Sequence, residues 1–189
     1  MSPLYVPQAP FPTNYLAPTG MAAETFPRNS QNVGAIGIAT GTLYLVGINL
    51  PAGLSIGHIV FHGVAAAVTP THWWFGLYDS SRVQLATTAD QTTTAWAGNT
   101  AKNLAVATIA SGAASAFVTT YTGMHYLGIC QVATTPATMA IAVMGFTAQS
   151  IAPIPAGLSS TAQTTPPAFA FTAGAITSSS NYAYATVGA

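Results

Sequence analysis

Residues 71–88 read as a β-hairpin, and this unit constrains the fold more than any other part of the chain. Hydrophobic residues at Trp73, Phe75 and Leu77 alternate with their neighbours, which is the period-two pattern of a strand. A polar reversal follows at residues 79–82, and the alternation then resumes. The pattern favours antiparallel strands over helices.

The same texture recurs along the chain and predicts short strands separated by glycine or proline. The predicted strands are residues 42–49, 56–62, 71–78, 83–88, 102–109, 116–122, 125–132 and 139–146. We expect 116–122 and 125–132 to pair with each other around a turn at Thr122-Gly123. Short strands of this kind, without a convincing helix or an internal repeat, predict an all-β, antiparallel β-sandwich that is jelly-roll-like.

Residues 1–35 interleave prolines with aromatic residues. Proline removes a backbone donor and keeps the preceding residue extended, so a helix or a central strand is not expected here. We expect an extended N-terminal arm whose rings dock into pockets, including pockets on a neighbouring subunit; the alternative is an undocked terminus. The docking residues of this arm would be Tyr5, Phe11, Tyr15 and Phe26.

Residues 151–189 return to a composition rich in proline, alanine, threonine and serine. Phe169 and Phe171 are expected to dock this second arm, which could add short edge strands around these residues and at 182–187. The predicted organisation is an N-terminal arm at 1–35, a β-sandwich domain at 36–150 and a C-terminal arm at 151–189.

Charged residues are scarce: the 189-residue chain has three basic and three acidic side chains, or 3%. An average soluble domain has about 25%. Three cations are too few to neutralise a phosphate backbone, so nucleic acid is excluded as an expected partner. The longest apolar stretch, residues 56–68, contains two histidines and is too short to span a bilayer. A neutral surface instead suits a homo-oligomer, with a trimer expected, inside a large assembly.

No catalytic constellation is visible in the sequence. Asp79 is explained as a turn residue, Asp90 as the cap of a loop, and Glu24 lies in the N-terminal arm. Cys130 is the single cysteine and sits in the middle of a strand, where a buried, inert thiol is expected. The glycines form no phosphate-binding fingerprint. The sequence therefore predicts a protein that is not an enzyme and carries no cofactor.

The histidines do not predict a metal site either. His58 and His62 point to the same face of a strand but stand about 13 Å apart, too far to share one ion. His72 and His125 have no ligand-spaced partner. A role for the four histidines in pH-sensitive assembly is a further hypothesis.

Sugar binding is the one site hypothesis with support from the sequence, because exposed aromatic rings stack on sugar faces. Strand alternation puts Trp73 and Trp74 on opposite faces of the sheet, so one of them is expected in the core. Trp96, in the polar loop 91–100, is expected to be exposed, and Trp74 and Tyr78 are the other candidate glycan contacts. The alternative is that all three tryptophans pack inside.

Three segments carry a resemblance to a known group of proteins: WWFGLYDSSRVQLATTADQTTTAWAGNTAKNLAVAT, TTYTGMHYLGI and TTPPAFAFTAGAIT. Over roughly residues 41–187 the chain resembles small virion-associated or uncharacterised proteins of phages that infect actinobacteria. The runs GTLYLVGINLPAG, HWWFGLYD and YTGMHYLGI are also similar to jelly-roll modules of the carbohydrate-binding type. The chain departs from such modules in having few acids or amides near its aromatic residues.

The resemblance implies a structural protein of the virion, made in the cytoplasm of the host bacterium. The expected role is a capsid-surface decoration or head-fibre protein, with the major capsid protein as its partner. The alternative is a tail-associated protein that recognises a glycan of the host cell wall. A carbohydrate-processing enzyme module is a third reading, disfavoured because the sequence shows neither a signal peptide nor paired acids.

Overall fold

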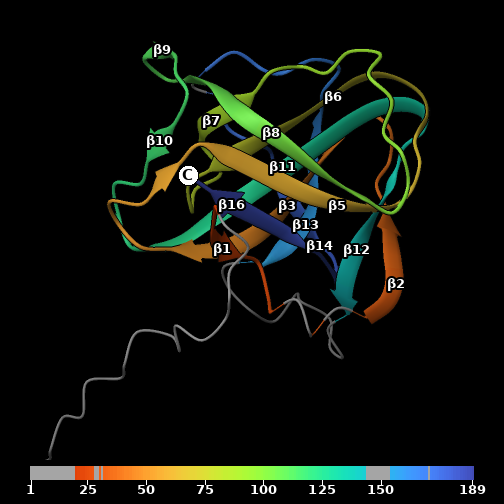
Figure 1. The fold of residues 1–189 in the computed structure, drawn as a ribbon, viewed down its shortest axis with the longest axis horizontal. Coiled ribbons are helices and arrows are strands. Elements are labelled where there is room, and N and C mark those ends of the chain that lie inside the picture. Colours follow the sequence, from red (N-terminus) through yellow and green to blue (C-terminus); the bar gives the residue numbers. More distant parts are fainter. Residues whose placement is uncertain (1–19, 28–29, 31, 144–153, 170) are drawn as a thin grey trace, which may run out of the picture.

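A computed structural model describes residues 20–27, 30, 32–143, 154–169 and 171–189 of the chain. The described residues form β-strands joined by turns and loops (Figure 1). The strands are β1 (Met21–Glu24), β2 (Asn32–Gly37), β3 (Thr42–Leu50), β4 (Ser55–Ile56), β5 (His58–Ala65), β6 (Val68–Tyr78), β7 (Gln84–Thr88), β8 (Thr100–Ile109), β9 (Gly112–Ala113), β10 (Phe117–Val118), β11 (Gly123–Thr135), β12 (Thr138–Val143), β13 (Ala156–Ala162), β14 (Ile176–Ser178), β15 (Asn181–Ala183) and β16 (Ala185–Gly188).

The strands are arranged in two layers that share β8. This strand pairs with β5 through residues 100–105 and with β7 through residues 106–109, so it passes from one layer into the other. The first layer contains β1, β16, β5, β12, β2 and β15, and the second has the order β7-β6-β11-β3-β13-β14. The pairings between these strands are antiparallel. The predicted all-β, antiparallel β-sandwich is confirmed.

The core lies between the inner faces of the two layers. Alternate residues of β6 point inward, namely Trp73, Phe75 and Leu77, and they meet Ile59 and Phe61 of β5 in one buried cluster. Burying apolar area in this way is the main stabilising contribution to a fold of this size. The alternation that predicted the hairpin is therefore the alternation that fills the core.

The outer face of the second layer is buried as well. Ile154, Phe171, Ala173 and Ile176, from the segments on either side of β13, pack there against side chains of β3, β6 and β11. We call this the outer cluster: Leu43, Leu45, Trp74, Tyr78, Tyr126, Cys130, Ala173 and Ile176. Because both faces of this layer are covered, β6 is an almost continuous run of buried residues from Trp73 to Tyr78.

Most of the predicted strands are present, but one predicted pairing is wrong. Residues 116–122 do not pair with 125–132: β10 is short and pairs with β4, whereas β11 pairs with β3 and β6. The long apolar strands compete for β11 on both of its edges, and this outweighs the local turn at Thr122-Gly123. Residues 144–146 of the last predicted strand lie outside the described residues.

The flanking segments contribute strands to the sandwich. β2 crosses the predicted boundary at residue 35 and pairs with β12, and β13 extends the second layer beside β3. Residues 182–187 lie in two short strands: β15 pairs only with β12 among the described strands, as an edge strand does, whereas β16 lies between β1 and β5 and is not an edge. β16 consists of small residues, and these fit between the two neighbouring strands. Residues 1–19 lie outside the described residues.

Three of the predicted docking residues can be located. Phe26, two residues after the end of β1, contacts the ring of Tyr184, with ring centroids 5.2 Å apart. Phe171 packs against the outer cluster, and Phe169 is half-buried. The contacts of Phe26 and Phe171 are made within their own chain. Tyr5, Phe11 and Tyr15 lie outside the part of the chain that the structure describes.

Candidate functional site

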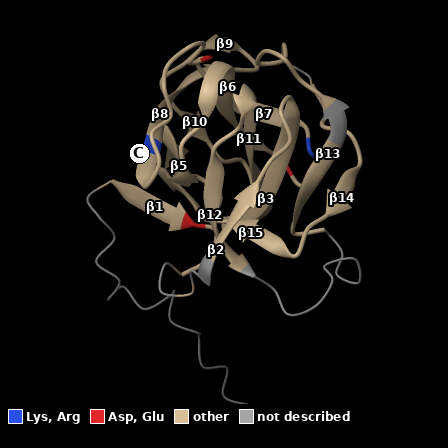
Figure 2. Ribbon diagram, turned by 90° about the vertical axis from the view of Figure 1, so that its right-hand side faces the viewer, with Lys and Arg blue, Asp and Glu red and all other residues tan. Residues whose placement is uncertain are grey.

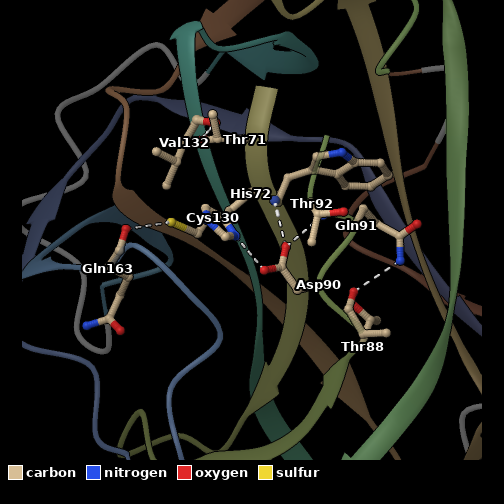
Figure 3. A network of polar contacts seen from close by, with 11 residues as sticks. Thr71, His72, Thr88, Asp90, Gln91, Thr92, Cys130, Val132 and Gln163 are labelled. Carbon is tan, nitrogen blue, oxygen red and sulfur yellow. Dashed lines mark hydrogen bonds and ion pairs between the residues drawn. The ribbon is translucent and has the colours of Figure 1, made fainter. Parts of the chain in front are cut away.

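A hydrogen-bonded pair of His72 and Asp90 is the clearest polar centre beside the central hairpin (Figure 3). His72 lies on β6, and Asp90 follows the end of β7; the Nδ1 and Oδ2 atoms are 2.6 Å apart. The second carboxylate oxygen of Asp90 accepts hydrogen bonds from the backbone N–H of Thr92 at 3.0 Å and of Trp73 at 3.3 Å. The predicted role of Asp90 as a loop cap is confirmed.

A His–Asp pair can activate a nucleophile, and the nucleophilic side chain on the neighbouring strand is Cys130. Cys130 lies on the neighbouring strand β11, where its Sγ atom donates a hydrogen bond to the carbonyl of Gln163 at 3.7 Å (Figure 3). The thiol is fully buried, and burial raises the pKa of Cys130 to about 12. The thiolate, which is the reactive form, is therefore not populated near neutral pH. The predicted buried cysteine is confirmed.

The other two carboxylates also bind their own surroundings. Asp79 accepts hydrogen bonds from the backbone N–H groups of Ser81 and Val83, each at 2.8 Å, which confirms its role as a turn residue. Glu24 lies on β1 and accepts a hydrogen bond from the hydroxyl of Tyr184 at 2.7 Å. The three acids are thus attached to separate elements, and none of these contacts brings two carboxylates to one substrate bond.

The four histidines lie in different environments. His58 is 3.1 Å from the carbonyl of Ala189, and the ring of His62 contacts that of Tyr184. Among the described residues, no group of three or more His, Cys, Asp or Glu side chains could hold a metal ion.

The predicted exposed ring of Trp96 is wrong. Its side chain is only 1% exposed and packs against Trp73 and Phe75, with ring centroids 4.8 and 5.7 Å apart. The loop around it is polar and mostly exposed, but the ring turns inward because Gly63 leaves room for it. A Cβ atom at Gly63 would lie 2.4 Å from the indole nitrogen of Trp96.

Trp74 and Tyr78 are also unavailable to a glycan. They are 1% and 0% exposed in the outer cluster, where Phe171 and Ala173 pack over the sheet. Trp73 is 2% exposed in the core, so the alternative that all three tryptophans pack inside is confirmed. The structure thus brings together none of the predicted glycan contacts on the surface.

Paired glycines were the sequence signal that could have revealed this packing. Gly76 of β6 and Gly128 of β11 are register partners. The ring of Tyr78 lies over both glycines. A Cβ atom added at Gly76 would be 2.8 Å from that ring, and one added at Gly128 would be 2.6 Å from it. Glycine inside a strand marks a close approach by another group. Here it marks an aromatic ring held against the sheet rather than presented to solvent.

His125 is a buried titratable group at the start of β11. Its Nδ1 atom is 3.1 Å from the carbonyl of Gly123, and its ring stacks on Tyr121 at 4.2 Å between centroids. Its Nε2 atom is buried and has no hydrogen-bond partner among the described residues. Burial lowers the pKa of His125, although the Gly123 carbonyl and the charge of Asp79 oppose this effect.

Acidification is therefore expected to destabilise the fold through His125. Below about pH 6.5 the unfolded chain takes up a proton that the folded chain resists, and the free energy of unfolding falls by up to about 1.4 kcal/mol per pH unit from this group. Denaturant unfolding of the wild type and of His125→Gln between pH 8 and pH 5 measures the effect. The variant should lose less stability on acidification. Equal losses in the two proteins would show that His125 is not responsible.

Among the described residues, no helix is long and apolar enough to cross a membrane. Comparison with models of known protein families and with curated proteins finds no match to this chain.

Proposed function

We propose that this chain is a non-enzymatic structural protein of a bacteriophage virion, used as a capsid-surface decoration or head-fibre protein. The proposal includes assembly as a homo-oligomer, with a trimer expected, and attachment to the virion, with the major capsid protein as partner, through the arms of the chain. The observation that carries it is the near-absence of charge from a well-packed sandwich.

The described residues contain only a few charged side chains; Asp79 and Arg82 share one turn, and the others are scattered over the sandwich (Figure 2). Most of them form hydrogen bonds within the chain. Asp79 and Asp90 accept hydrogen bonds from backbone N–H groups of their own loops. Glu24 accepts one from the hydroxyl of Tyr184, and the Nε atom of Arg82 donates one to the carbonyl of Ala173 at 3.3 Å. Free soluble domains depend on surface charge to stay apart, whereas the centres of protein interfaces are depleted of charge. A surface of this kind suits permanent contact with other subunits.

The environments of the reactive groups support a role without catalysis. The Cys130 thiol is buried and protonated, and the carboxylates serve loops and strands. The alternative, a glycan-binding tail protein, has less support, because the rings of Trp74, Tyr78 and Trp96 that were its candidate contacts are buried.

Attachment to the virion is tested by removing residues 1–19. The cut spares β1 and β2, which pair within the sandwich, so the truncated protein should keep the far-UV circular dichroism and melting temperature of the full chain. It is expected to lose its place on the particle, as seen by immunogold labelling of virions assembled with each form. A chain in which residues 1–19 are replaced by a Gly/Ser linker of equal length is the matched control and should also fail to attach. Normal attachment of the truncated protein would contradict the proposed role of the arm.

A further inference from the structure

Among the described strands, β2 is an edge strand of the sandwich with one side unpaired. This strand pairs with β12 through Gly37, Ile36 and Ala35, and none of the described strands pairs with its other side (Figure 1). With six residues it is longer than β1 or β14, the strands at the two ends of the main sheet path. Its sequence, NVGAIG, contains no charge and no proline, the devices by which proteins usually protect an exposed edge.

Residues 8–18, QAPFPTNYLAP, have the sequence of a strand that can pair along one edge only. Its prolines are at even positions, Pro10, Pro12 and Pro18, while every odd position from 9 to 17 has a backbone N–H. In an extended strand, successive N–H groups point to opposite edges. The odd edge of this segment can therefore pair with a sheet, while the prolines leave the even edge unable to accept another strand.

We propose that residues 8–18 of a second copy of this chain add to the open edge of β2 as an extra strand. The odd positions include Phe11 and Tyr15, whose side chains would then lie on the same face of the added strand. No charged side chain precedes Glu24, so docking desolvates no side-chain charge on the arm, and none on β2. The prolines would end the sheet at the new edge.

The number of residues between the arm and β2 favours docking on a second copy over docking within the same chain. β1 and β2 lie along the outer side of the first layer, β1 beside β16 and β2 beside β12. A chain that turned back at residues 19–20 would set residues 8–18 opposite 21–31, and only residues 2–7 opposite β2. Pairing of 8–18 with β2 thus links one subunit to the next. The inference rests on the proposed function and deepens its homo-oligomer part, because it names the contact by which residues 8–18 of one copy join the next.

Two proline substitutions in the full-length chain test the proposal, with self-association measured by sedimentation over a wide concentration range. Thr13→Pro removes an N–H from the pairing edge and is expected to weaken self-association about tenfold or more. Asn14→Pro is the matched control, because it alters only the edge that prolines already block. It should leave self-association within about twofold of the wild type. Amides of β2 should be protected from hydrogen exchange in the wild type and in Asn14→Pro, and less protected in Thr13→Pro.

Equal effects of the two substitutions, or a wild type that stays monomeric throughout, would overturn the proposal. So would unchanged exchange at β2 in Thr13→Pro. The measurement is made in solution without virions, so its failure is distinct from failure of the proposed virion role. A protein that self-associates through β2 but is absent from particles would keep this inference and lose the function.

Discussion

Replacing Trp96 with alanine is expected to lower the free energy of unfolding by about 3–5 kcal/mol, the cost of removing a large aromatic side chain from a core. The ring is enclosed by Trp73, Phe75 and the backbone at Gly63, so the cavity cannot be filled by a small movement of a surface group. Denaturant unfolding of the wild type and the variant measures the difference.

Thr93→Ala is the control for this experiment. Thr93 is exposed in the same loop, three residues before Trp96, and its loss should change stability by no more than about 0.5 kcal/mol. A cost below about 1 kcal/mol for Trp96→Ala would mean that the ring is not part of a packed core. The Trp96 ring would then be available as a surface contact.

Gly128→Ala is expected to destabilise the protein by about 1–3 kcal/mol, although it adds one methyl group. The new Cβ atom would lie 2.6 Å from the ring of Tyr78 and 3.1 Å from methyl groups of Leu43 and Leu45. All of these side chains are buried in the outer cluster, so none can move aside without disturbing the packing of that cluster. Thermal or denaturant unfolding reports the loss.

Gly37→Ala is the matched substitution in a strand that has room. The nearest atom to its Cβ position is the methyl group of Thr138 at 3.9 Å, an ordinary contact. We expect a change close to zero or a slight gain, because alanine restricts the unfolded chain more than glycine does. In a Tyr78→Ala background the cost of Gly128→Ala should shrink. Equal costs with and without the Tyr78 ring would contradict the packing described for the outer cluster.

Local periodicity was sufficient to predict the central strands. β3, β6 and β11 have long alternating runs, and the turn at Asp79 follows from the preference of aspartate for hydrogen bonds to the backbone two residues on. These features depend on near neighbours in the sequence. The fold class and the roles of Asp79 and Asp90 could therefore be predicted from the residues alone.

The flanking strands and Trp96 depend on distant partners instead. β16 is a run of small residues whose burial is caused by β1 on one side and β5 on the other. Trp96 sits in a polar loop, and the room for its ring comes from Gly63, more than thirty residues earlier. Neither relation has a local signature, so the polar loop wrongly predicted an exposed ring, and the residues of β16 wrongly predicted a sheet edge.

The number of copies of this protein in each virion tests the central proposal most directly. Quantitative mass spectrometry of purified particles, calibrated on the major capsid protein, gives that number. A decoration protein that covers the capsid surface should be present in hundreds of copies per particle and remain after washing in high salt, because contacts without charge are not screened. A few copies per particle, or none, would contradict the decoration role.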